Sequence, residues 1–351
     1  MVTADAELLD HALAVTASAG VEAAVIDDPL AARASWSAAT IIIVGIDLAP
    51  RLLGLGLPRR PETYVVGPES RQHELAACSA PLGAAVVSLP ESAGWLSGAV
   101  ADVSGSRRDS RTVAVVGGVG GAGVSTLAAA VAGAGVRRRL STFLVDADPL
   151  GGGLDVVLGA ERVSGWRWSR LARAQGHVGD LRGHVLQVDG LDLLSHDREP
   201  AEVRPESMTA VLTSVGRSHA LVVVDVGRHD LVGIGGAVVG QADRTMLVVP
   251  ARVRAVAAAE QVLGRLTDLG AETELVVRAV RGGLEPSAVG HGLGRPVLGV
   301  VVDDADVRRS AERGEPPGRR AGSSLGRVAA ELLDAVLPLD RDTRPRRGFG
   351  G

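Results

Sequence analysis

The residues with the clearest chemical potential form a glycine-rich loop that opens at residue 117. Five glycines fall within seven residues, and a serine and a threonine follow soon after. Consecutive glycines let backbone N–H groups converge on an anion, and the start of a following helix adds the positive end of its dipole. The loop therefore predicts a phosphate site, whose candidate contacts are Gly118, Gly120, Gly121, Ala122, Gly123, Val124, Ser125 and Thr126.

The loop matches the spacing of a nucleotide-binding P-loop at every position but one. In the pattern G-x-x-x-x-G-K-[ST], Gly118 and Gly123 take the glycine positions and Ser125 takes the magnesium-ligand position. Val124 stands where the pattern has lysine, and the chain has no lysine at all, because all 37 basic residues are arginine. A plain glycine-rich turn would explain some of these glycines, but the spacing and the serine favour P-loop ancestry.

Three aspartates at the ends of apolar runs could act together with the loop. Asp146 and Asp148 close the run FLVDAD, and Asp225 closes LVVVD. Ser125, Asp146 and Asp225 are candidate magnesium ligands, because Mg²⁺ prefers oxygen. Aspartates at strand ends also cap the turns or helices that follow, so both roles stay open at this point.

The elements that must position these residues alternate between apolar strands and helices. A first series of Val- and Ile-rich runs lies at 21–26, 39–46, 62–67 and 83–89. A second series lies at 112–118, 141–148, 190–196, 220–227, 244–251, 273–280 and 297–304, with a closing helix at 324–337. Continuous apolar runs separated by helices are typical of parallel sheets covered on both faces. We expect two doubly wound α/β domains at 1–103 and 112–340, a linker at 104–111 and a mobile tail at 341–351.

Composition narrows the class of partner. The 351-residue chain is 46% hydrophobic and has a net charge of −4, so it lacks the basic field that gathers nucleic acid. A single cysteine, Cys78, rules out an internal disulfide and a multi-cysteine metal site. The first residues lack the features of a secretory leader, and no apolar window reaches the ~18 residues of a membrane span. These features predict a cytoplasmic protein.

The loop and the aspartates together resemble those of the MinD/ParA ATPases. That family has a deviant P-loop, x-K-G-G-x-G-K-[ST], and the resemblance places its two lysines at Val119 and Val124. The segment at 143–159 is similar to the one in which the family's second aspartate, here Asp148, orients the attacking water. LVVVDVG at 221–227 resembles the Walker B strand and puts Asp225 near the magnesium. Further similar stretches at 242–266 and 297–317 extend the resemblance over roughly 112–340.

Within this family the chain is similar to the CpaE/TadZ branch, and most of all to actinobacterial CpaE-like, septum-site-determining proteins encoded beside Tad/Flp-type secretion genes. The resemblance implies a positioning or scaffold protein that is recruited to the septum or a pole. It implies protein partners from the division or the secretion and pilus machinery, and a homodimer. It implies no specific nucleic acid and at most a peripheral contact with a membrane.

Loss of both lysines would change the chemistry that the family performs. Phosphoryl transfer depends on positioning and on neutralising the charge at the β- and γ-oxygens, which a valine cannot do. We expect ATP or ADP with Mg²⁺ to bind weakly, with little hydrolysis and with Asp148 as the water-orienting residue in any turnover. The alternative is an active ATPase that cycles on a partner or membrane surface. Arg228 or the run 137–139 would then replace the lysines, although solvated or carboxylate-paired arginine is the commoner role.

Residues 1–103 resemble a CheY-like receiver domain. The resemblance implies a phosphoacceptor at Asp47, a further acidic residue at Asp5, and a lysine at the end of the fifth strand, where this chain has Ser88 or a neighbour. Because the lysine is missing, we expect a pseudoreceiver that docks without accepting a phosphoryl group. Its first strand would be short.

Overall fold

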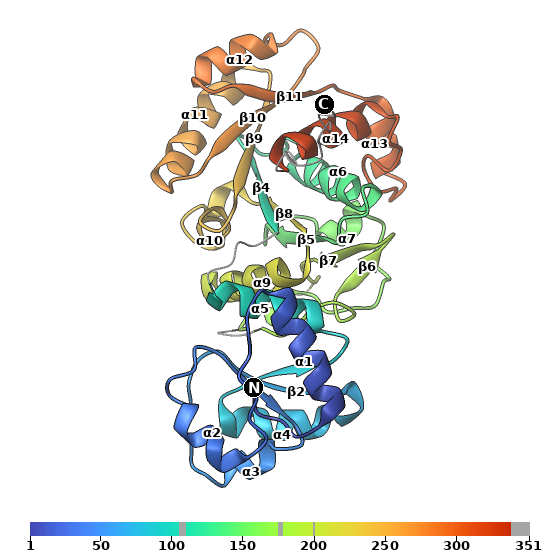
Figure 1. The fold of residues 1–351 in the computed structure, drawn as a ribbon. Helices are drawn as coiled ribbons and strands as arrows, with labels where there is room; N and C mark the ends of the chain where they lie inside the picture. Colours follow the sequence, from blue (N-terminus) through green and yellow to red (C-terminus); the bar gives the residue numbers. More distant parts are fainter. Residues whose placement is uncertain (105–109, 175–177, 199–200, 338–351) are drawn as a thin grey trace, which may run out of the picture.

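The computed structural model describes residues 1–104, 110–174, 178–198 and 201–337. Figure 1 shows two α/β units stacked end to end, with the N-terminal unit below the larger second unit. Most of the predicted linker at 104–111 and all of the predicted tail at 341–351 lie outside the described residues.

The N-terminal unit is built on a parallel sheet of three strands, in the order β1 (Ile42–Gly45), β2 (Thr63–Gly67) and β3 (Ala85–Ser88). Val2 forms one parallel bridge to Val44 and another to Ile26. The two strands predicted at the start of the chain are thus reduced to single bridges beside β1. Counted with them, the strand order is 2-1-3-4-5, which is the order of flavodoxin and CheY.

Helices cover both faces of this sheet because successive strand residues point to opposite sides. Ile43 and Tyr64 face one helical layer, while Val44 and Val65 face the other. The first layer holds α1 (Ala6–Ser18) and α5 (Ala93–Ser104). The second layer holds α2 (Pro29–Ser35), α3 (Ala49–Leu53) and α4 (Gln72–Leu82), which follows the short 3₁₀ helix η1 (Glu69–Arg71).

The second unit contains a sheet of eight described strands in the order β11-β10-β9-β4-β8-β5-β7-β6. All neighbours are parallel except β6 and β7. The strands are β4 (Arg111–Gly117), β5 (Thr142–Ala147), β6 (Leu186–Val188), β7 (Leu191–Leu194), β8 (Leu221–Val226), β9 (Arg244–Pro250), β10 (Thr273–Arg278) and β11 (Val297–Val301).

The predicted strand list lacked β6, which is only three residues long. Its pairing to β7 depends on a two-residue turn in which Asp189 has a φ of 50° and Gly190 a φ of 85°. Asp-Gly at such a position is the usual signal of a hairpin whose two central residues both have positive φ. The Asp-Gly pair was therefore the sequence signal for β6, because a strand of three residues is too short to show a hydrophobic period.

Helices pack on both faces of the larger sheet, and α14 lies directly beside α6. The predicted closing helix at 324–337 is confirmed as α14. One face is covered by α6 (Val124–Arg137), α7 (Leu154–Val157) and α14 (Ser324–Val336). The other is covered by α9 (Pro205–Ser218), α10 (Ile234–Val239), α11 (Val253–Asp268) and α12 (Pro286–Leu293). The remaining helices are α8 (Trp168–Leu171), η2 (Arg228–Asp230) and α13 (Ala305–Ala311).

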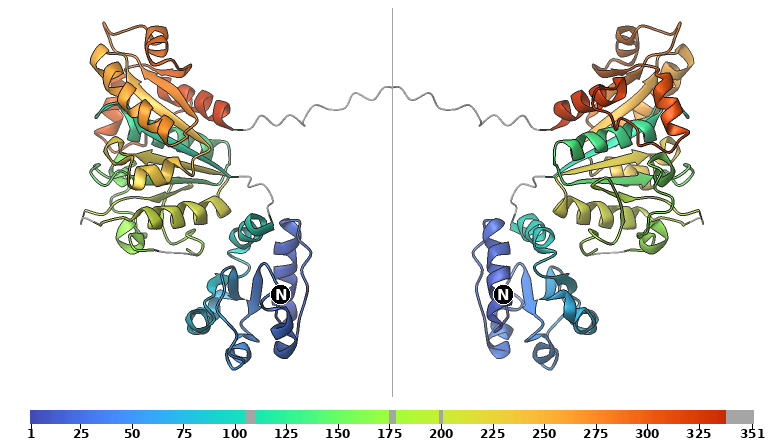
Figure 2. Two further views of the ribbon diagram at one scale, coloured as in Figure 1. Left: turned by 90° about the vertical axis from the view of Figure 1, so that its left-hand side faces the viewer. Right: turned by 90° about the vertical axis from the view of Figure 1, so that its right-hand side faces the viewer.

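The two units meet where α5 packs against α9 (Figure 2). The indole Nε1 of Trp95 donates to the Ser214 hydroxyl at 3.0 Å. Arg217 forms a 3.0 Å ion pair with Asp102, and its guanidinium lies 5.0 Å from the centre of the Trp95 ring. A cation over an aromatic face and a largely buried ion pair both resist separation in water. These contacts attach the N-terminal unit to α9, one of the helices that cover the larger sheet.

Candidate functional site

The candidate site lies at the carboxyl edge of the central strands of the larger sheet. β8 runs between β4 and β5, and all three are parallel, so their carboxyl ends meet at one edge. In this register Asp146 of β5 is the direct neighbour of Asp225 on β8. The phosphate loop leaves β4 at Gly117 beside them. Ligands of open α/β sheets bind at such an edge.

Backbone geometry explains most of the glycines in the loop. Gly121 has a φ of 69° and Gly123 a φ of 97°, values that side-chain-bearing residues rarely adopt. A Cβ on Gly118 would lie 2.7 Å from the Cβ of Ala259 on α11, so this glycine allows close packing. A Cβ on Gly120 would meet open space. The glycine there leaves the backbone accessible.

The loop ends in the first turn of α6, which supplies the N–H groups that could hold an anion. The N–H groups of Val124, Ser125 and Thr126 have no acceptor within the helix, as in the first turn of any α-helix. No side chain among the described residues caps this end. The N–H of Gly118 is different, because it donates to the carbonyl of Val248 at 2.9 Å. Gly118 therefore shapes the loop, and the free donors begin after it.

Ser125 and Asp225 form the polar centre of the site. The Ser125 hydroxyl hydrogen-bonds the Asp225 carboxylate, whose residue is only 3% exposed. Burial raises the pKa of Asp225 to about 7, the negative charges of Asp146 and Asp148 add to this, and the bond from Ser125 opposes it. A hydroxyl and a carboxylate side by side fit Mg²⁺, which takes one or two protein ligands together with waters and phosphate oxygens.

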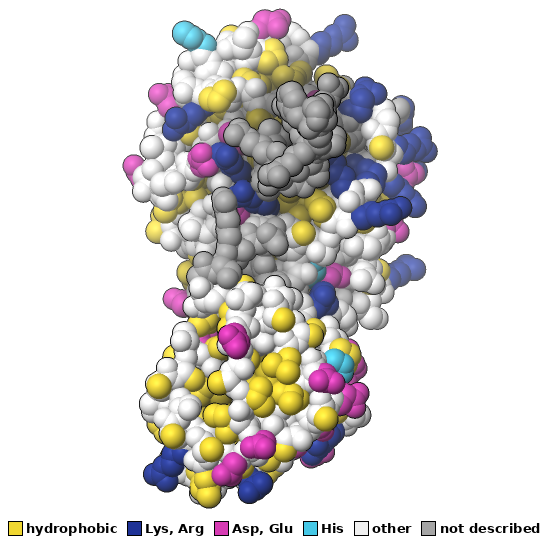
Figure 3. All heavy atoms as spheres, in the orientation of Figure 1, with side chains coloured by type: hydrophobic (Ala, Val, Ile, Leu, Met, Phe, Trp, Pro, Cys, Tyr) yellow, Lys and Arg dark blue, Asp and Glu magenta, His cyan; other side chains and the backbone are white. Residues whose placement is uncertain are grey.

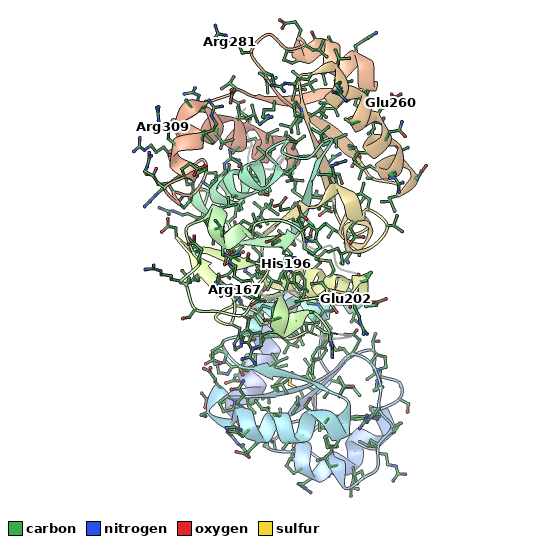
Figure 4. The ribbon with its side chains drawn as sticks, turned by 180° about the vertical axis from the view of Figure 1, so that it is seen from behind. Arg167, His196, Glu202, Glu260, Arg281 and Arg309 are labelled. Atoms are coloured by element: carbon green, nitrogen blue, oxygen red, sulfur yellow. The ribbon has the colours of Figure 1, made fainter. Side chains whose placement is uncertain are left out.

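The carboxylate of Asp146 is hydrogen-bonded to neighbouring groups of the protein. It accepts the N–H of Asp148 at 3.2 Å, the N–H of Leu154 at 3.0 Å and the Ser195 hydroxyl at 3.3 Å. Burial raises the pKa of Asp146 and lowers the pKa of the neighbouring His196 (Figure 4). Of the two roles left open by the sequence, the structure favours the cap that organises the loop after β5.

Asp148 stands on that loop, close enough to Asp225 to raise its pKa. Its carboxylate also accepts the N–H of Leu150 at 3.1 Å. Within the described residues, no three His, Cys, Asp or Glu side chains gather into a ready metal site. Any magnesium here would therefore depend on Ser125, Asp225 and the oxygens of a bound phosphate.

The two valines at the lysine positions belong to the core. Val119 and Val124 are partly buried and pack against the apolar cluster beneath α6. Substitution by lysine would withdraw apolar surface from that cluster. The structure therefore gives both valines a packing role.

The arginines at 137–139 do not replace the missing lysines. Arg137 ends α6, a helix of 14 residues, and at 1.5 Å per residue it lies about 20 Å from Val124. Arg138 forms an ion pair with Asp334 on α14 and also donates to the carbonyl of Ala330. Arg228, the other candidate, is exposed in η2 after β8. The run 137–139 thus lies at the C-terminal end of α6, opposite the loop.

A cavity of about 140 Å³ opens beside the loop. Gly123 and Thr126 line it from the loop and α6, and Val301 and Val302 line it from the end of β11. Arg278, the last residue of β10, reaches the same cavity. Arg278 is not among the site residues predicted from the sequence, although a single charge closing the apolar run TELVVR was a signal for it.

In the N-terminal unit, Asp47 is already bonded to the chain. It accepts the Thr3 hydroxyl at 2.8 Å and the N–H groups of Ala4 at 2.7 Å and Asp5 at 3.1 Å. Asp5 in turn caps α1 by accepting the N–H groups of Glu7 and Leu8. Ser88 ends β3. Both acidic side chains thus hold the start of the chain in place.

The helices of the described residues can be checked for their ability to span a membrane. None of these helices combines the length and the apolar character that crossing a bilayer requires.

Comparison with known proteins relates both units to described folds. Residues 2–111 match the family model "Rv3660c-like, CheY-like N-terminal domain". The uncharacterized protein Rv3660c of Mycobacterium tuberculosis is 33% identical over 314 residues, which cover 87% of this chain and 88% of that protein.

Two solved structures resemble the larger unit. A ParA family ATPase from Chlorobium tepidum has a TM-score of 0.58 and 20% identity, over 66% of this chain and 99% of its own. The septum site-determining protein MinD from Pyrococcus horikoshii, solved with Mg-ADP, has a TM-score of 0.55 and 18% identity, over 65% and 96%. At such identities the likeness concerns the fold. The predicted fold class, a CheY-like domain followed by a MinD/ParA-like α/β domain, is confirmed.

Proposed function

The chain belongs to the family of the Mycobacterium tuberculosis protein Rv3660c, and on that premise we propose that it is a positioning or scaffold protein with a weak nucleotide site. Its second domain would bind a nucleotide with Mg²⁺ and hydrolyse it little. The bound nucleotide would control which protein surfaces the molecule presents. The P. horikoshii MinD structure with Mg-ADP makes ATP and ADP the first nucleotides to test.

One observation carries this proposal. The loop keeps its backbone donors and the bonded pair Ser125 and Asp225, while Val119 and Val124 at the lysine positions pack into the core. The donors of α6 and the helix dipole would hold the phosphates. Magnesium, when bound, would supply charge neutralisation at the phosphate oxygens. Without a lysine, the loop itself adds no cation to stabilise charge that develops during phosphoryl transfer.

The N-terminal unit would act as a docking domain that does not accept a phosphoryl group. The Asp47 carboxylate accepts three hydrogen bonds from residues 3–5, which precede α1. Ser88, and not a cationic residue, ends β3. The contact between α5 and α9 would tie any partner bound there to the larger unit. These contacts support a pseudoreceiver.

For partners, we propose proteins of the division machinery or of a Tad/Flp-type secretion or pilus system, as in CpaE-like proteins, with recruitment to the septum or a pole. A homodimer and a peripheral membrane contact are compatible with this role. The support is the sequence resemblance together with the fold shared with a septum site-determining MinD.

Specific nucleic-acid binding is not part of the proposal. Arginines gather at one side of the larger unit, over α13 and the loop that follows it (Figure 3). Two of them are paired with carboxylates: Arg308 with Asp303, and Arg313 with Glu315 at 2.7 Å. Paired arginines leave less positive charge for phosphate backbones.

Titration calorimetry with Mg-ADP and Mg-ATP on the full chain, with phosphate release followed in parallel, tests the proposal. We expect weak binding that Ser125→Ala reduces further, without phosphate release above background. Ser164→Ala, at an exposed serine remote from the loop in sequence, is the control. Turnover that depends on Asp148 would instead support the alternative of an active ATPase cycling on a partner or surface.

A further inference from the structure

We propose that the cavity beside the phosphate loop selects a nucleotide with a guanine-type base, and that Arg278 reads the base. The inference rests on the proposed nucleotide site and names the ligand class that this site prefers. Nucleotides with a 6-oxo purine would bind better than adenine nucleotides.

The position of the cavity makes it the place for a base. It shares Gly123 and Thr126 with the loop and the first turn of α6, where the phosphates would be held. A nucleotide anchored there by its phosphates has its base only a sugar away. β10 is separated from β4 by β9 alone, so its carboxyl end reaches the same edge of the sheet.

The walls of the cavity suit a flat aromatic ring. Apolar side chains form much of the lining: Leu127, Val248, Val301, Val302, Val307 and Leu325. The volume of about 140 Å³ suits a group the size of a purine base. Ligand sites of this kind are largely apolar, with a few polar groups that fix orientation and specificity.

Arg278 is the polar group that fixes orientation here. Among the described residues its Nε has no hydrogen-bond partner, although the atom is buried. Arg308, which lines the same cavity, is by contrast committed to Asp303. A buried donor left without an acceptor costs free energy, and the side chain would recover it by turning its guanidinium toward an acceptor on a bound base.

The chemistry of a guanidinium decides between the purines. Arginine has five N–H donors and no acceptor, so the base edge that faces it must present acceptors. Guanine carries two adjacent acceptors, O6 and N7, and arginine binds both at once. Adenine carries an amino donor beside N7. This donor meets the N–H groups of a guanidinium without an acceptor between them, whereas the amide of asparagine can pair with both positions.

The carboxylates in the lining complete the match. Asp303 and Asp304 also line the cavity, and Asp304 accepts the Ser324 hydroxyl at 2.5 Å. Ionised carboxylates accept hydrogen bonds and donate none. Guanine supplies donors for such groups at N1–H and at its 2-amino group, on the edge next to O6.

Equilibrium binding of Mg-GDP, Mg-IDP and Mg-ADP to the full chain tests the inference. Inosine keeps O6, N7 and N1–H but lacks the 2-amino group, so the difference between GDP and IDP measures the contribution of that amino group alone. We expect GDP and IDP to bind about tenfold or more tightly than ADP. In Arg278→Asn this preference should disappear through loss of GDP and IDP affinity, with ADP affinity kept or improved.

Two further variants keep the result interpretable. Arg278→Lys retains the charge but not the two-pronged donor, so it should lose most of the preference for GDP while retaining the fold. Arg281→Asn, on the exposed loop after β10 (Figure 4), should leave all three affinities unchanged.

Three outcomes would overturn the inference. Equal affinity of the wild type for GDP and ADP would show that the cavity does not read the base. Equal loss of GDP and ADP affinity in Arg278→Asn would show that Arg278 neutralises phosphate instead. Failure of the wild type to bind any of the three nucleotides would refute the nucleotide site itself, and the inference with it.

Discussion

Ser125, in the first turn of α6, is hydrogen-bonded to Asp225 near the end of β8, so the phosphate loop is joined to the neighbouring strand. The bond connects the two residues that fit a magnesium ion. It persists although both lysine positions of the loop hold valine. The pair that we propose as magnesium ligands is therefore present in a chain that has valine at both lysine positions.

The buried Asp225 predicts a dependence of stability on pH. Its pKa is raised from 3.8 to about 7, so the folded state keeps a proton that the unfolded chain releases. This contribution to the free energy of unfolding is full below about pH 4, is lost as the pH rises to about 7, and then levels off. Asp225→Asn should remove it and should gain about 4 kcal/mol over the wild type at pH 8, with little gain at pH 4. Urea unfolding at several pH values measures this difference.

Ser125→Ala provides the matched test of the same relationship. The hydroxyl bond lowers the pKa of Asp225, so its removal should move the wild-type pH profile to higher pH. An unchanged profile in Ser125→Ala, or an Asp225→Asn variant that follows the wild type at every pH, would contradict this account of the buried carboxyl.

Magnesium binding should follow the ionisation of the same carboxyl. Because Mg²⁺ requires the ionised form, affinity for a Mg-nucleotide should rise between about pH 6 and pH 8. Calorimetric titrations across this range, repeated with EDTA, measure the effect. In Asp225→Asn the rise should be absent, and a rise of full size in that variant would place the metal elsewhere.

Restoring the lysine should strengthen nucleotide binding. Val124→Lys places an ammonium at the start of α6, and a hydrogen bond from a charged donor should increase affinity by about tenfold or more. Part of the gain offsets the apolar contact that Val124 gives up. Val124→Leu, which stays apolar, is the control and should leave affinity near that of the wild type. Equal affinities of the Lys and Leu variants would show that the loop does not hold phosphate.

The contact between the two units should contribute to stability. Arg217→Ala removes the ion pair with Asp102 and uncovers one face of the Trp95 ring. Because both partners of the pair are largely buried, we expect a loss of about 3 kcal/mol in the free energy of unfolding. Arg265→Ala on the exposed face of α11 should change stability little. Similar unfolding curves for the two variants would show that the units do not stabilise each other.

Acetyl phosphate should leave the N-terminal unit unmodified. The three hydrogen bonds to Asp47 hold its carboxylate against residues 3–5. Intact-mass spectrometry after incubation with acetyl phosphate and Mg²⁺ should show no added phosphoryl group. An adduct that disappears in Asp47→Asn would establish a working receiver.

Sequence periodicity and spacing predicted the two α/β units and the position of the glycine-rich loop between β4 and α6, because those signals are local. Strand β6 escaped because three residues carry no period. The engagement of the Gly118 N–H by Val248 escaped because it joins β9 to a loop that follows β4. Arg278 escaped for the same reason, since only the order β10-β9-β4 brings it near the loop. The suggestion that Arg137 could replace a lysine failed on the length of α6.

Hydrogen–deuterium exchange with and without saturating Mg-nucleotide tests the central claim most directly, because it reports binding at the loop itself. We predict protection in peptides that span 117–127 and 221–227, together with the cavity segment 297–304. We expect the same protection after long incubation, since the nucleotide is not consumed. Exchange that is unchanged in these peptides, while the protein is shown to bind the nucleotide, would contradict this claim.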